Sequence, residues 1–60
     1  MKYYATIEAP AQTQKIYKEG NAFFVCSSDS MTEHYGDPEK YIQKVLKRAD
    51  QLNMKVVIRR

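Results

Sequence analysis

One segment of the chain, residues 37–53, repeats its apolar residues with the period of an α-helix, and this pattern constrains the fold more than any other feature. Asp37 is a suitable N-cap, Pro38 suits the first helical position, and Asn53 suits a left-handed C-cap. At 100° per residue, the apolar side chains fall within an arc of about 140°. They are Tyr41, Ile42, Val45, Leu46, Ala49 and Leu52. This arc is predicted to pack against a core supplied by the rest of the chain.

The other apolar residues alternate with polar ones, which is typical of β-strands. Strands are predicted for residues 2–8, 13–18, 22–26 and 54–59. Within the first strand, strict alternation puts Tyr3 on the same face as Ala5 and Ile7, and Tyr4 on the opposite face. The second strand has only one strong apolar residue, so we expect it at an edge or half exposed. Gly20 predicts a hairpin turn between the second strand and the third.

The polar segment 27–36 is predicted to be a loop. Ser30 and Glu33 fit a capping box inside it, which favours one short helical turn that stops at Gly36. The predicted fold is therefore a small α+β domain over residues 1–60, with the order β-β-β-α-β. One sheet of three to four strands would carry a single helix on one face, and its other face would be partly open.

Charge is divided unevenly along the chain. Residues 40–60 carry seven cations and one acid, whereas residues 1–39 carry three cations and six acids, which together give the net charge of +3. The seven cations are Lys40, Lys44, Lys47, Arg48, Lys55, Arg59 and Arg60. Three of the lysines, at spacings of four and three, share the side of the predicted helix opposite its apolar arc. A basic block of this kind favours an anionic partner.

We therefore predict a small non-enzymatic interaction module that binds a macromolecule through its basic helix and C-terminal strand. The partner would be an acidic protein surface or, as the alternative, a nucleic-acid backbone bound mainly at its phosphates with little sequence specificity. The open edges of the predicted sheet would also allow a homodimer through an edge strand. Small α+β proteins of this kind are often bacterial, phage or plasmid accessory proteins, which is an analogy from the fold.

The tyrosines have two interpretations. An exposed pair of Tyr4 and Tyr17 across neighbouring strands would be able to stack unpaired bases. Alternatively, the same pair would stabilise a thin sheet by cross-strand packing, or contact a protein partner.

No catalytic residue, cofactor or metal site is predicted. Cys26 and His34 are the only residues of their types, and no third group is evident that would orient a Cys–His pair. One Cys and one His cannot supply the four usual ligands of zinc, and the acids of the 27–37 region lack EF-hand spacing. The lone cysteine, with no signal peptide and no apolar run of about 20 residues, predicts a cytoplasmic protein without a membrane partner.

The opening residues Lys2-Tyr3-Tyr4-Ala5-Thr6-Ile7-Glu8 resemble the first strand of HicB-type antitoxin domains. The resemblance covers this one strand. The Phe-Pro-Asp-containing segment that usually follows in that family is replaced here by Pro10 and a Gln/Thr stretch. No function is carried over from the family.

Overall fold

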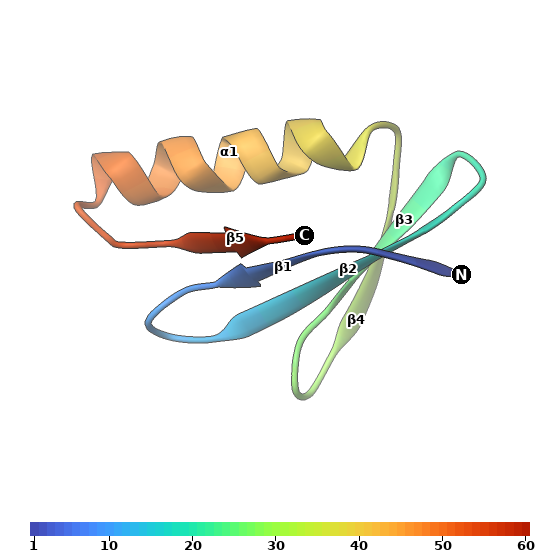
Figure 1. Ribbon diagram of the computed structural model, residues 1–60, viewed down its shortest axis with the longest axis horizontal. Coiled ribbons are helices and arrows are strands. Elements are labelled where there is room, and N and C mark those ends of the chain that lie inside the picture. The colour runs from blue at the N-terminus through green and yellow to red at the C-terminus, as the bar shows by residue number, and fades with distance from the viewer.

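A computed structural model describes all 60 residues and contains five strands and one helix. The elements are β1 (Lys2–Glu8), β2 (Thr13–Glu19), β3 (Ala22–Cys26), β4 (Met31–Tyr35), α1 (Pro38–Gln51) and β5 (Val57–Arg59). The strands form one antiparallel sheet in the order β4-β3-β2-β1-β5. In Figure 1, α1 runs above β5 in the opposite direction, and β4 crosses the direction of β5 because the sheet is twisted. The α+β class is thus confirmed, whereas the predicted strand count and order are not.

The strand that the sequence analysis did not predict is β4. Its residues were expected to form a loop with one helical turn. It pairs with β3, so the sheet has five strands where three to four were predicted. Ser30 cannot cap a helix here, because its carbonyl accepts the Ser27 amide at 2.8 Å and its hydroxyl contacts the Ser27 hydroxyl at 2.8 Å, which closes a tight hairpin. The strand lies at an edge and buries none of its side chains fully, so its sequence shows no apolar alternation.

The second strand was predicted to lie at an edge or to be half exposed, and the structure shows a half-exposed strand that is not at an edge. β2 is the central strand of the sheet, flanked by β1 and β3, and Ile16 is completely buried. One strong apolar residue is enough for this position, because only one face of the sheet is covered by the helix. On that covered face, Gln14 accepts a hydrogen bond from the Tyr41 hydroxyl at 3.3 Å.

A β-bulge in β1 changes which tyrosine faces which side. Tyr3 is opposite Tyr17 and Ala5 is opposite Ile16, so Tyr4 is an extra residue in the pairing. The predicted alternation is therefore wrong at this point. Tyr3 lies on the open face of the sheet with Tyr17, whereas Tyr4 packs against the core on the helix side.

The helix has the bounds that its capping residues predicted. The Asp37 side chain accepts the Glu39 amide at 3.0 Å, and Pro38 occupies the first turn. At the other end, Asn53 adopts φ 58°, and the Met54 amide donates to the Ala49 carbonyl at 2.8 Å. These contacts form a Schellman motif, which turns the chain back toward the helix. The helix is too short and too polar to cross a membrane.

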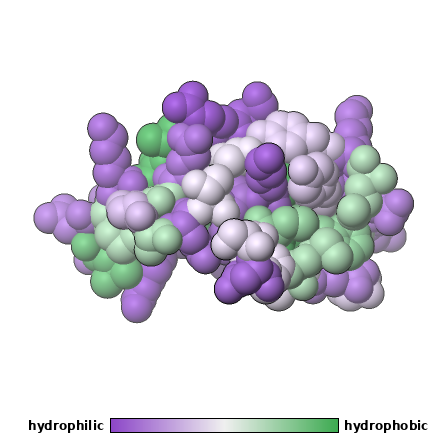
Figure 2. Space-filling view, turned by 90° about the horizontal axis from the view of Figure 1, so that it is seen from below, coloured by the Kyte–Doolittle hydropathy of each residue, from purple (hydrophilic) through white to green (hydrophobic).

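The core lies between α1 and the first three strands. Its fully packed members are Ala5, Ile7, Ile16, Phe23, Val25 and Ile42. Tyr41, Val45 and Leu46 pack against this cluster as predicted, but Leu52, at the helix end, is 51% exposed. A core this small leaves apolar side chains at the surface, and Figure 2 shows green hydrophobic patches between the purple hydrophilic ones.

Candidate functional site

The two C-terminal arginines are each paired with a carboxylate of the chain, Arg59 on the open face of the sheet and Arg60 at the start of α1. Arg59 points to the open face of the sheet, where its Nε donates to Glu8 Oε1 at 2.8 Å. Arg60 pairs with Glu39 through both terminal guanidinium nitrogens, Nη1 and Nη2, with Nη2 donating to Oε1 at 2.9 Å. Each arginine therefore has a carboxylate partner within the chain, whereas the prediction grouped both with the helix lysines as partner-binding residues.

Tyr4 belongs to the same cluster as Arg60. Its hydroxyl donates to Glu39 Oε2 at 2.5 Å, and the Arg60 guanidinium lies 5.9 Å from the centre of its ring. The hydrogen bond from Arg60 lowers the pKa of the Glu39 carboxyl, and the hydrogen bond to Glu39 raises the pKa of the Tyr4 hydroxyl. Tyr4 therefore contacts both the residue after β5 and the first turn of α1. It does not form the predicted pair with Tyr17.

Tyr17 has a different tyrosine as its neighbour. Its ring meets the ring of Tyr3 edge to face, with the centroids 5.9 Å apart and the planes at 73°. A cross-strand tyrosine pair therefore exists, but the partner of Tyr17 is Tyr3 and not the predicted Tyr4. The bulge at Tyr4 causes this difference. The pair lies on the side of the sheet away from the basic helix.

Five of the predicted cations remain without an ion-pair partner. All five are exposed and none takes part in a salt bridge: Lys40, Lys44, Lys47, Arg48 and Lys55. At 100° per residue, Lys40 and Lys47 project almost directly away from the buried side of α1, whereas Arg48 lies at its flank. The helix therefore presents two kinds of cation, one surrounded by solvent and one beside apolar groups.

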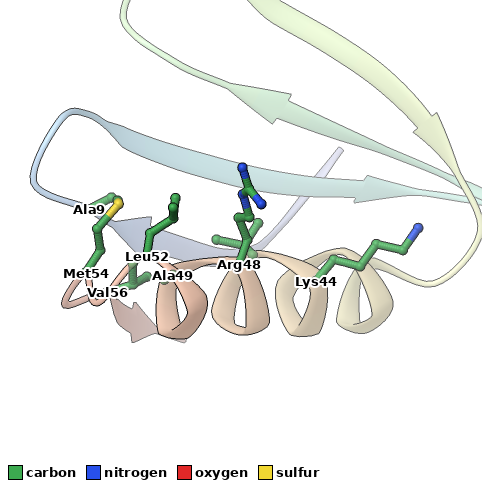
Figure 3. Close-up of a pocket in the computed structure, with 8 residues that line it drawn as sticks. Ala9, Lys44, Arg48, Ala49, Leu52, Met54 and Val56 are labelled. Carbon is green, nitrogen blue, oxygen red and sulfur yellow. The ribbon is translucent and has the colours of Figure 1, made fainter.

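The apolar groups beside Arg48 form a groove, which we call the helix groove (Figure 3). Its volume is about 270 Å³. It is lined by Ala9, Lys44, Val45, Arg48, Ala49, Leu52, Met54 and Val56. Leu52 and Met54 are 51% and 39% exposed, so two large apolar side chains face solvent next to two unpaired cations.

Local sequence features build this groove. Lys44, Arg48 and Leu52 are four residues apart, so they follow one another along a single side of α1, as Figure 3 shows. The Schellman turn then brings Met54 back to the helix, where it lies near Ala9 of the β1–β2 loop (Figure 3). The groove could not be predicted from the sequence, because Ala9 is far from the helix in the chain and comes next to it only on folding. The available signal was an apolar arc that continues to Leu52, the last residue before the C-cap turn.

A second hollow lies at the start of α1 and has a mixed lining. His34 stacks on Phe23 with centroids 5.1 Å apart, and Tyr41 lies 5.3 Å from the same imidazole. His34 is on the helix side of β4 and Cys26 is on the opposite face of β3, so the two do not form a dyad. No group of three or more His, Cys, Asp or Glu side chains is arranged to hold a metal ion.

The sequence matches no protein-family model, and no curated protein or solved structure matches the chain.

Proposed function

We propose that the protein is a non-enzymatic interaction module that binds an acidic, partly apolar segment of another protein in the helix groove. One observation carries this proposal, namely an apolar groove with two unpaired cations on its rim. An apolar side chain of the partner would be buried against Leu52 and Met54, and carboxylates beside it would pair with Lys44 and Arg48.

The apolar contact would supply most of the affinity. Burial of one Leu-sized side chain contributes about 1.5–3 kcal/mol. An exposed ion pair contributes about 0.2–1 kcal/mol, so Lys44 and Arg48 together would add less than one well-buried apolar anchor. Their charges would mainly accelerate association and exclude basic segments.

A nucleic-acid backbone is the second candidate, and the unpaired cations of α1 support it. The residues that the sequence analysis assigned to nucleic-acid binding do not, however, lie on one surface. Arg60 and Tyr4 are engaged with Glu39, Arg59 is engaged with Glu8, and Tyr17 faces the other side of the sheet. Phosphate groups also gain no free energy from contact with the apolar walls of the groove. The groove therefore favours a protein segment over a nucleic-acid backbone.

Two double variants separate these candidates. Lys44→Glu/Arg48→Glu reverses the two cations on the groove rim, and Lys40→Glu/Lys47→Glu reverses two cations outside it. Both change the net charge equally, and Lys and Glu have similar helix propensities. The probes would be a fluorescent 12-residue peptide of Leu and Glu, its Ser-for-Leu counterpart, and labelled single-stranded and duplex oligonucleotides.

We expect the Leu/Glu peptide to bind the wild-type chain, and to bind the groove variant about 2- to 30-fold more weakly because two ion pairs are lost. The control variant should lose little affinity. The Ser-containing peptide should bind at least about 10-fold more weakly, because one apolar anchor is worth more than 1.4 kcal/mol. Equal losses in both variants, or equal binding of both peptides, would contradict the proposal. Oligonucleotide binding with a log–log salt slope of about −4 to −5 would favour the phosphate-binding alternative instead.

A further inference from the structure

The face of the sheet opposite α1 is uncovered and carries two rows of side chains across the strands. The first row runs from β1 to β4 and consists of Tyr3, Tyr17, Phe24 and Glu33. The second row runs from β5 to β4 and consists of Arg59, Thr6, Lys15, Cys26 and Met31. We call the surface formed by these two rows the open face.

The open face exposes several large apolar side chains to solvent. The first row contains three aromatic rings on adjacent strands, those of Tyr3, Tyr17 and Phe24. Tyr3 is 46% exposed. Met31 is 60% exposed at the end of the second row, and Tyr35, at the other end of β4 on the same face, is 77% exposed. An apolar surface that spans several strands marks a contact site more often than an ordinary solvent-facing surface.

Charge on this side of the sheet argues against a phosphate backbone. Two cations, Lys15 and Arg59, stand against three carboxylates, those of Glu8, Glu19 and Glu33. Arg59 is in addition paired with Glu8 at 2.8 Å. The unpaired cations of α1 all lie on the other side of the sheet, so the open face is nearly neutral while the helix surface is strongly basic. A nearly neutral apolar face that bears both signs of charge can meet a second copy of itself without net repulsion.

We propose that the open face is the contact surface between two copies of this chain, which pack as two sheets face to face with the helices outside. This arrangement keeps the basic surfaces of the two helices as far apart as the molecule allows. It also covers the aromatic row, which nothing in the single chain covers.

The positions of the charges select one orientation of the two copies. A two-fold axis parallel to β2 would place Lys15 against its own counterpart, because β2 is the middle strand of five. A two-fold axis that crosses the strands between the two rows avoids this. It sets Tyr17 of each copy against Lys15 of the other, and Phe24 against Cys26. Cation and ring then attract one another, and no like charges meet.

The size of the open face predicts a weak dimer. Five strands about 4.8 Å apart and three to seven residues long, at about 3.3 Å per residue, give a face of about 300–450 Å² in projection. Two such faces, enlarged by the relief of their side chains, reach only the lower end of specific interfaces, about 1,000–1,200 Å².

Edge pairing is the competing route to a dimer, and the edges are poorly suited to it. β5 has three residues and ends in Arg59. β4 is longer, but antiparallel pairing of two copies centred on its middle residue would set Glu33 directly opposite Glu33. Like charges in such a cross-strand pair are destabilising.

The test is sedimentation velocity from about 5 to 500 µM, a range chosen for weak association. We expect the wild-type chain to shift from monomer to dimer with concentration and Phe24→Lys to remain monomeric. Met31→Glu is a second variant that cannot impair folding through lost burial, because Met31 is already 60% exposed. It should weaken the dimer as well, because the orientation above sets residue 31 of each copy against Glu33 of the other. Lys47→Glu, on the outer side of α1, is the matched control and should dimerise normally.

The single cysteine distinguishes a face-to-face dimer from an edge dimer. Cys26 lies in the second row of the open face, so its alkylation rate should fall several-fold as wild-type protein is concentrated, and should stay constant in Phe24→Lys. A chain that is monomeric at all concentrations would overturn the proposal. A dimer that leaves Cys26 equally reactive and survives both Phe24→Lys and Met31→Glu would overturn it too, and would place the contact at an edge.

Discussion

Leu52 and Ile42 lie in the same apolar arc of α1, yet the structure assigns them opposite roles. Ile42 is completely buried among β1, β2 and β3, whereas Leu52 is 51% exposed in the wall of the helix groove. Replacement of each by alanine should therefore separate folding from binding. Ile42→Ala should destabilise the fold, and Leu52→Ala should weaken binding of an acidic apolar peptide while the fold persists.

The magnitudes follow from the burial of each side chain. Removing a fully buried Ile costs about 2–5 kcal/mol, which is most of the roughly 3–5 kcal/mol that a core in a chain of this length supplies. Leu52 buries about half of its side chain on folding, so its truncation should cost only about 0.8–1.5 kcal/mol of stability. The other half becomes buried when a peptide binds. Losing that contact should weaken the affinity about 4- to 12-fold.

Urea unfolding followed by far-UV circular dichroism measures the first quantity, and fluorescence anisotropy with the Leu/Glu peptide measures the second. Ile42→Val, with an expected cost of about 0.5–1.5 kcal/mol, keeps the comparison measurable if Ile42→Ala does not fold. The measurements belong at low micromolar protein, so that self-association does not add to the apparent stability. The reasoning would be refuted by Leu52→Ala destabilising the fold as much as Ile42→Ala, or by Leu52→Ala leaving the peptide affinity unchanged.

Three further predictions concern the ends of the helix. The pKa of Glu39 is lowered in the folded chain, so its ionised carboxylate should stabilise the fold at neutral pH. This stabilisation should disappear as the pH falls below 4.5 and through the lowered pKa. The unfolding midpoint of Glu39→Gln should not show this loss of stability at acid pH. Tyr4→Phe should remove the tyrosine that ionises last in an alkaline ultraviolet titration, because its pKa is raised by Glu39. Asn53→Ala, at φ 58°, should cost about 1 kcal/mol in urea unfolding, whereas Asn53→Gly should be tolerated.

Local signals predicted the elements whose ends are set by neighbouring residues. The helix begins after Asp37 and Asn53 ends it, because an N-cap and a left-handed residue act within a few positions of themselves. The edge strand β4 could not be predicted in this way. Its stability comes from backbone pairing with β3, and its polar side chains leave no apolar period in the sequence.

The candidate site was predictable in its charge but not in its geometry. Composition identified the basic block, yet the partners of Arg59 and Arg60 are 51 and 21 residues away in the chain. Pairing at such separations depends on which strand neighbours which, and alternation along the sequence carries no information about strand order. The bulge at Tyr4 is a similar case, because one extra residue reverses the face of every earlier side chain in the strand.

The two proposed surfaces lie on opposite sides of one sheet, and this placement has a consequence for how they would work together. In a dimer joined by the open faces, both helices lie outside, so neither helix groove is covered. Packed sheets are about 10 Å apart and a helix adds about 10 Å on each side, which separates the two grooves by about 30 Å. A partner with two acidic apolar segments on a linker that reaches around this distance would then bind both grooves of one dimer. Its affinity would exceed that of a single segment without any new contact. Phe24→Lys should abolish this gain and leave the affinity of each groove for a single segment unchanged.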